Sequence, residues 1–301
     1  MIAAFLLALC SLHLPQSLLA AGQLRQARDA FSLALSCSAS DALLTASALT
    51  GLASAEQDLF LHNEAELHYR KALVLLESRA PDSPAHAEAL NGLGSLYFQL
   101  HRLSLAESHT RRALAILTPN DAAKARMLSN LAVTLQAWGK LREAASAYAE
   151  ALSLLENHKS PEAAFLFSNR GLLHAAERRP LEAIADLETA LAIWRKSLPP
   201  NHPHLAFGEG NLARVLTLNA RHAAAEPHWR DAVAIAEPAF GPDHRVTGSL
   251  YAAWAHTLRR LNRNNESKQA AARARRILNG HPPDPWLTHR ADIRALTGGS
   301  R

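Results

Sequence analysis

The chain has 301 residues, of which 60 are alanine and 52 are leucine, so helix-forming side chains dominate its composition. Aromatic residues make up only 6%, with 13 glycines and 15 prolines, which excludes a β-sandwich, a β-barrel and a collagen-like chain. The 48% of hydrophobic residues excludes a disordered chain, and the net charge is +5. Cys10 and Cys37 are too few for a disulfide framework or a cysteine-rich zinc site, and no apolar run is long enough for a multi-pass membrane protein. A nearly all-helical chain remains.

The first residues resemble a secretory signal. Residues 2–14 form an apolar stretch, and Pro15 and several small residues up to Ala21 follow, where a signal peptidase could cut. Residues 1–21 are therefore predicted to be a signal peptide, and the protein to be exported to a periplasm or secreted. The alternative is a buried first helix in a cytoplasmic protein, because no lysine or arginine precedes the apolar stretch.

Further along, six stretches of the sequence align with one another without gaps. They are residues 49–73, 90–114, 128–152, 167–191, 209–233 and 251–275. Three columns of the alignment hold small residues. The first column is Ala53, Gly94, Ala132, Gly171, Ala213 and Ala255. The second is Ala65, Ala106, Ala144, Ala183, Ala225 and Ser267. The third is Ala72, Ala113, Ala151, Ala190, Ala232 and Ala274. Internal repeats of this length are typical of stacked supersecondary units.

The columns predict a stack of helical hairpins. In each unit two apolar-periodic segments of helical length flank a short break, which falls at His101, Gly139 or Arg178 in three of the copies. Helices joined by so few residues must lie antiparallel. Where their axes come closest, only Ala, Gly or Ser fits. One hairpin cannot bury its apolar face alone, but a stack can.

This spacing of small residues resembles the tetratricopeptide repeat. The Pro-rich links at 198–204, 240–244 and, more loosely, 80–84 resemble the connectors of the kinesin-light-chain-type subclass, whose period is 42 residues. Proline next to a helix start fixes φ, and we expect the aspartates of these links to cap free amide groups. The resemblance spans residues 22–278 and implies an all-α fold, an α-α superhelix of about six to seven helical hairpins.

The repeats also predict the domain organisation. Residues 22–40 are expected to form a partial N-terminal capping repeat, because Pro15 would fall at the tight small-residue position of its first helix. Residues 41–279 are expected to form six hairpins in one array. Residues 280–301 are expected to form a C-terminal capping helix and a basic tail.

No motif in the sequence indicates catalysis or a metal. His202 and His204 are the tightest histidine cluster, but no third ligand follows at a predictable spacing. There is no HExxH motif, GxSxG elbow, P-loop or dinucleotide-binding glycine fingerprint. We therefore expect no enzyme activity, metal, cofactor or small-molecule substrate.

The positive charge is confined to the end of the chain. Residues 1–254 carry 22 basic and 24 acidic side chains, whereas residues 255–301 carry 10 basic and 3 acidic ones. A basic end of this kind is typical of a solvated terminal repeat, and it also suits an acidic protein partner or an anionic lipid surface. Nucleic acid is not expected, because no aromatic residues interleave with the basic ones, and membrane integration is not expected either.

The family resemblance places the first helix of each hairpin on a concave, peptide-binding face. Asn130, Asn169 and Asn211 share one register there, and Asn91 lies one position earlier in the preceding repeat. Asparagine can pair with the backbone of an extended peptide. The remaining candidates on this face are Gln136, Arg214, His256 and Arg259. The last three favour an acidic ligand at the C-terminal repeats.

The function predicted from these patterns is a non-enzymatic scaffold that binds an extended peptide or protein segment in its concave groove. Two alternatives remain. One is a structural or assembly protein that uses the solenoid ends or the convex face to build an oligomer or an envelope complex. The other is an enzyme whose site has no recognisable motif.

Overall fold

The structure is a computed structural model, and it describes residues 12–20, 23–38, 41–118, 122–155 and 159–279. These residues form fourteen helices and no strands, which confirms the all-α prediction. The chain divides into an N-terminal unit, residues 1–154, and a C-terminal unit, residues 155–301.

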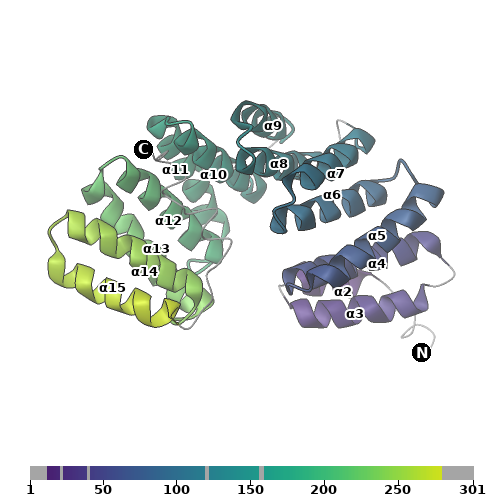
Figure 1. The fold of residues 1–301 in the computed structure, drawn as a ribbon, viewed down its shortest axis with the longest axis horizontal. Coiled ribbons are helices and arrows are strands. Elements are labelled where there is room, and N and C mark those ends of the chain that lie inside the picture. Colours follow the sequence, from purple (N-terminus) through teal and green to yellow (C-terminus); the bar gives the residue numbers. More distant parts are fainter. Residues whose placement is uncertain (1–11, 21–22, 39–40, 119–121, 156–158, 280–301) are drawn as a thin grey trace. The chain divides into compact units, whose positions relative to one another are not determined.

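The N-terminal unit is a stack of helical hairpins (Figure 1). Its described helices are α2 (His13–Ala20), α3 (Leu24–Cys37), α4 (Ala42–Asp58), α5 (His62–Arg79), α6 (Pro84–Gln99), α7 (Leu103–Ile116), α8 (Ala122–Ala137) and α9 (Leu141–Ser153). The pairs α2–α3, α4–α5, α6–α7 and α8–α9 pack as hairpins, and each hairpin packs on the next.

The C-terminal unit repeats the same design. Its described helices are α10 (Pro161–Ala176), α11 (Pro180–Ser197), α12 (Pro203–Leu218), α13 (His222–Phe240), α14 (Arg245–Arg260) and α15 (Asn264–Leu278). They pair as α10–α11, α12–α13 and α14–α15, and successive pairs are in contact. The hairpins from α4 to α15 lie within residues 41–279, and the assignment of these residues to one array stays a prediction.

The three columns of small residues lie at the contacts between helices. All their members are buried apart from Ser267, which is half-buried. At Gly171 a Cβ atom would lie only 3.1 Å from the carbonyl oxygen of Ala183 in the partner helix. At Gly94 it would lie 3.2 Å from the corresponding oxygen of Ala106. Close approach of the two backbones is therefore the reason for the small residues, as predicted.

Each hairpin turn from α4–α5 onward contains one residue with positive φ, in the same register of the repeat. These residues are Phe60, His101, Gly139, Arg178, Ala220 and Asn262. The amide of the next residue donates to the carbonyl five residues before it, as from Arg102 to Tyr97 (2.8 Å) and from Arg221 to Leu216 (2.9 Å). This is the Schellman ending of an α-helix, which reverses the chain within a few residues.

The Pro-rich links start the next helix in a way that differs from the prediction. The helix is capped by Ser83 rather than Asp82 in one link, and by His244 rather than Asp243 in another. His244 Nδ1 accepts a hydrogen bond from the amide of Val246 at 3.2 Å. The prediction of aspartate caps in these links is thus wrong, because the capping position lies one residue further along the chain.

The beginning of the described chain forms a short helix, α2, that packs on α3. Pro15 is buried and is the third residue of α2, so it lies in the first turn and interrupts no helix interior. Cys37 at the end of α3 is disulfide-bonded, and Cys10 lies outside the described residues. Most of the predicted signal peptide also lies outside them, and its cleavage stays a prediction.

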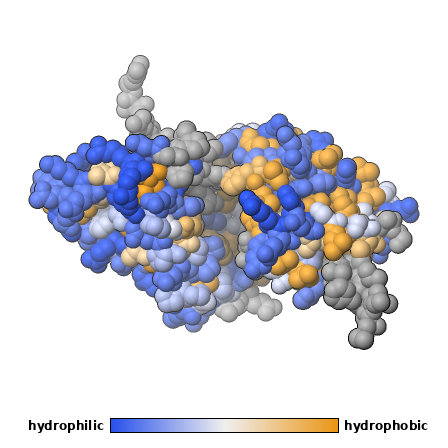
Figure 2. Space-filling model, turned by 90° about the horizontal axis from the view of Figure 1, so that it is seen from below, coloured by the Kyte–Doolittle hydropathy of each residue, from blue (hydrophilic) through white to orange (hydrophobic). Residues whose placement is uncertain are grey.

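The surfaces of the two units differ in character. On the face seen in Figure 2, hydrophobic residues gather over the N-terminal unit, whereas the C-terminal unit is mainly hydrophilic. The exposed large hydrophobic residues of the described C-terminal unit are only Phe165, Leu181 and Phe207.

Candidate functional site

The candidate site lies on the first helix of each hairpin. We call the faces formed by these helices the first-helix faces, made by α4, α6 and α8 in the N-terminal unit and by α10, α12 and α14 in the C-terminal unit. Consecutive first helices are in contact within each unit. Side chains one turn apart on each helix therefore line up with those of the neighbouring helix.

In the N-terminal unit the two candidate asparagines bind each other. Asn130 Nδ2 of α8 donates to Asn91 Oδ1 of α6 at 3.1 Å. Asn91 is only 4% exposed, whereas Asn130 is half-buried. Asn91 therefore joins two first helices, and Asn130 presents the more accessible amide. The one-position offset of Asn91 in the sequence is the signal that could have separated the two roles.

Gln136 belongs to a recurring bond inside the hairpin that the sequence reasoning missed. Its Oε1 accepts from the hydroxyl of Tyr148, twelve residues later, at 3.4 Å. Gln57 accepts from Tyr69 at the same spacing, at 3.1 Å. The sequence signal is a polar residue on the first helix with an aromatic hydrogen-bond donor twelve residues on.

In the C-terminal unit the candidates lie on all three first helices. Asn169 on α10 and Asn211 on α12 are both half-buried. Arg214 Nη2 donates to Asn211 Oδ1 at 3.1 Å, which occupies the oxygen of that amide and leaves its NH₂ group to donate. Asn211 and Arg214 thus form one polar group on α12.

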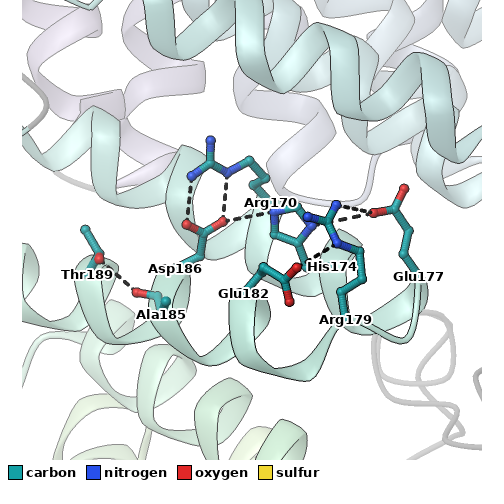
Figure 3. A network of polar contacts seen from close by, with 8 residues as sticks. All are labelled: Arg170, His174, Glu177, Arg179, Glu182, Ala185, Asp186 and Thr189. Atoms are coloured by element: carbon teal, nitrogen blue, oxygen red, sulfur yellow. Dashed lines mark hydrogen bonds and ion pairs between the residues drawn. The ribbon is translucent and has the colours of Figure 1, made fainter.

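Arg170 follows Asn169, and its guanidinium forms an ion pair with the second helix of the same hairpin (Figure 3). Its guanidinium donates to both carboxylate oxygens of Asp186 on α11, each at 2.7 Å. His174 Nε2 lies 3.6 Å from the same carboxylate. Asp186 is only 8% exposed, so this bidentate pair neutralises a largely buried carboxylate. It leaves the face of α10 without a free cation at this position.

The faces of α12 and α14 are cationic. Arg214 and His256 are half-buried and Arg259 is exposed. The sequence of α14 contains no acidic residue. The one carboxylate of α12, Glu209, is 2% exposed and is held by His228 at 2.8 Å and by Arg195 of α11. These two helices therefore present positive charge and no accessible carboxylate.

His256 is sensitive to its surroundings. Burial lowers the pKa of its imidazole, and the nearby positive charges of Arg259, Arg260 and His222 lower it further. The ring is thus harder to protonate than an ordinary histidine, and it provides hydrogen-bonding nitrogens rather than a fixed charge at neutral pH.

His202 and His204 have structural contacts. His202 Nδ1 accepts from the amide of His204 at 3.2 Å and caps α12. The ring of His204 packs edge-on against Phe165 at 4.5 Å between centroids and lies parallel to Trp194 at 5.9 Å. In the described part of the chain no group of three His, Cys, Asp or Glu side chains is placed to hold a metal ion.

One cavity lies within the N-terminal unit, between α7, α8 and α9, with a volume of about 450 Å³. Its floor contains Leu128, Leu131 and Leu135, each 4% exposed or less. Arg111 and Glu143 form an ion pair at its rim, at 2.8 Å. Because so little of the leucines is accessible, the cavity offers little apolar surface to a ligand.

Among the helices of the described chain, none is long and apolar enough to cross a membrane.

Comparison with known proteins agrees with this architecture. No curated protein matches the sequence. Among solved structures, the chain is similar to PilF of Pseudomonas aeruginosa, with 19% identity, a TM-score of 0.58, and 83% of this chain and 96% of that chain covered. It is similar to a kinesin light chain-like protein of Podosopora anserina with nearly identical TPR-like repeats, with 19% identity, a TM-score of 0.53, and 63% and 93% covered.

A third similar structure is the Cut9–Hcn1 hetero-tetramer of the APC/C, with 14% identity, a TM-score of 0.60, and 91% of this chain and 46% of that chain covered. At these identities the structures show a common fold alone. The sequence itself matches the model of the tetratricopeptide repeat at residues 44–118, 87–157, 162–226 and 205–279, which is most of the chain. The chain therefore belongs to the tetratricopeptide repeat family.

Proposed function

We propose that the protein is a non-catalytic scaffold that binds an extended, acidic peptide segment on the first-helix face of its C-terminal unit. Membership of the tetratricopeptide repeat family supports a protein-interaction scaffold in general. The observation that carries the finer proposal is the charge of α12 and α14, which present Arg214 and Arg259 and no accessible carboxylate, with His256 beside them as a hydrogen-bonding group.

The polar groups of this face have distinct roles in the proposal. The NH₂ group of Asn211 donates to a peptide carbonyl, while its oxygen is held by Arg214. Asn169 offers the equivalent amide on α10. Arg214 and Arg259 attract carboxylates of the ligand, and His256 donates or accepts as the ligand requires. In the N-terminal unit, Asn130 is the corresponding amide.

A peptide-binding assay tests the proposal. Labelled ten-residue peptides of acidic, neutral and basic composition are titrated with the full chain, and fluorescence anisotropy measures Kd. Acidic peptides are expected to bind with a Kd on the order of micromolar, since shallow peptide sites have modest affinity. Their binding should weaken as salt is raised.

The variant N211A/R214Q/R259Q removes one amide and two charges. At about 0.5–1 kcal/mol for each contact, Kd should rise by about tenfold or more. The matched control is K196Q/R275Q, which removes two exposed cations from the second helices of the same unit. If the site variant remains helical by circular dichroism and binds acidic peptides as wild type does, the proposed site is wrong. The solenoid ends or the convex face would then be the surface to test for an assembly role.

We also propose that the protein is exported, on the basis of the apolar residues 2–14. N-terminal sequencing of protein purified from fractionated cells tests this. A start near residue 22 in an exported fraction supports it, whereas an intact Met1 in the cytosolic fraction contradicts it.

A further inference from the structure

The hairpin turns of the C-terminal unit lie along one edge of that unit. Each hairpin packs on the next with first helix against first helix, so every turn recurs on the same side of the stack. We call this side the turn edge and define it by residues 177–181, 219–222 and 259–263. It is distinct from the first-helix face, which is formed by the sides of the helices rather than by their ends.

The carboxylates of the turn edge are already occupied by two arginines. Arg179 pairs with Glu182 at 3.0 Å and with Glu177 at 3.4 Å. Arg263 pairs with Glu226 at 3.1 Å and with Glu266 at 2.5 Å. No carboxylate of these described turns is left to neutralise a further cation.

Four more arginines lie on the same edge without such a partner. They are Arg178, Arg221, Arg259 and Arg260, all exposed. Within the described residues none of the four forms an ion pair. His222 and His256 lie among them, because Arg259, Arg260 and His222 are all close enough to lower the pKa of His256. Three successive turns therefore present a row of uncompensated positive charge.

An apolar side chain projects from the same edge. Leu181, the second residue of α11, is 75% exposed, more than any other large hydrophobic residue of the described chain. It lies three residues after Arg178. An exposed leucine that closely follows arginines can insert shallowly into a lipid headgroup region while the arginines stay at its polar surface.

We propose that the turn edge binds the surface of an anionic lipid bilayer. A planar surface can contact all three turns at once, because the turns lie in a row. Anionic lipid headgroups supply the negatively charged partners that these arginines do not have among the described residues. The side chain of Leu181 inserts below the headgroups, where the bilayer becomes apolar. This binding is peripheral, and it goes beyond the proposed peptide site because Arg259 is the one residue that the two surfaces share.

Vesicle binding by the full chain tests the proposal. Co-sedimentation is measured with vesicles of phosphatidylcholine alone and with vesicles containing roughly one third phosphatidylglycerol. Binding is expected only to the anionic vesicles, at about 0.05 M salt, and should be lost at about 0.5 M salt, where charges are screened within a few ångströms.

The variant R178Q/R221Q/R260Q locates the site and spares Arg259, which belongs to the proposed peptide site. Since each arginine near an anionic surface contributes a several-fold gain in affinity, the loss of three should weaken vesicle binding by about a hundredfold. The control K71Q/K196Q/R275Q removes the same charge from residues that are not part of the turn edge, and it should change binding by less than about threefold. Circular dichroism checks that both variants remain folded.

A second variant, L181S, tests the apolar contact and leaves every charge in place. We expect it to weaken binding to anionic vesicles several-fold. Equal losses in the site and control variants, or no binding of wild type to anionic vesicles, would overturn the proposal. Tighter binding of a single-stranded oligonucleotide than of vesicles would also overturn it and assign the arginines to nucleic acid. The peptide assay is read separately, so either proposal can fail alone.

Discussion

Replacing Arg170 with methionine removes the guanidinium from the buried pair with Asp186 and keeps most of the aliphatic stem. Arg170 lies over the ring of Phe167, 5.3 Å from its centroid, and methionine preserves part of that packing. Asp186 loses two hydrogen bonds of 2.7 Å and remains 8% exposed, so its charge is left without its main partner.

Breaking a fully buried pair costs about 3–5 kcal/mol. Here His174 Nε2 remains 3.6 Å from the carboxylate, and Asp186 retains some contact with water. We therefore expect R170M to lower the free energy of unfolding by about 2–3 kcal/mol. If the free energy of unfolding decreases by about 2 kcal/mol for each molar of urea, the midpoint of urea unfolding should fall by about 1–1.5 M.

A double-mutant cycle separates the pair from its surroundings. The variant R170M/D186L removes both charges, and we expect it to be less than about 1 kcal/mol below wild type, because no buried charge is left unpaired. Urea unfolding followed by circular dichroism measures all three proteins. If R170M costs less than about 0.5 kcal/mol, or if the double variant is as unstable as R170M, then the pair does not have the role assigned to it.

Three further predictions concern the hairpins of the C-terminal unit. G171L places a side chain against the carbonyl of Ala183, 3.1 Å from the position of a Cβ, and should lower the free energy of unfolding by about 2 kcal/mol or more in urea. A220G relieves a positive φ of 57° and should raise it by about 0.5–1 kcal/mol, and a loss in the same measurement would contradict a strained turn. The pKa of His204 is lowered, first by burial and then by His202, so its stabilising effect is present above about pH 6.5 and is lost as the pH falls through the lower folded-state pKa. The urea midpoint should therefore decrease from pH 7.5 to pH 5, and H204F should reduce that decrease.

The helical hairpins were predictable because their requirements repeat. A backbone approach that admits only a small side chain occurs in every copy, so the columns of Ala106 and Gly171 stand out in the sequence without any knowledge of distances. The turn residues follow the same register, although only Gly139 among them is a glycine. Because the other turns hold side chains at positive φ, their conformation could not be read from residue type.

The candidate site was predictable only in part. Register placed Asn91 and Asn130 on neighbouring first helices, but it could not show that one donates to the other and that Asn91 is buried. Likewise Arg170 and Asp186 are sixteen residues apart, and their pairing depends on how α10 and α11 face each other. A one-residue shift decides whether Asp243 or His244 caps α14.

The sequence by itself determined the period, the hairpins and the small residues between them, since each is a local requirement that every repeat must meet. The tertiary structure alone decided which charges are compensated. Arg170 and Arg179 meet carboxylates, whereas Arg178 and Arg221 meet none among the described residues, although Arg178 directly precedes Arg179. Whether an arginine meets a carboxylate depends on the direction in which its side chain leaves the end of the helix. Packing of the helices sets that direction, and position in the chain does not.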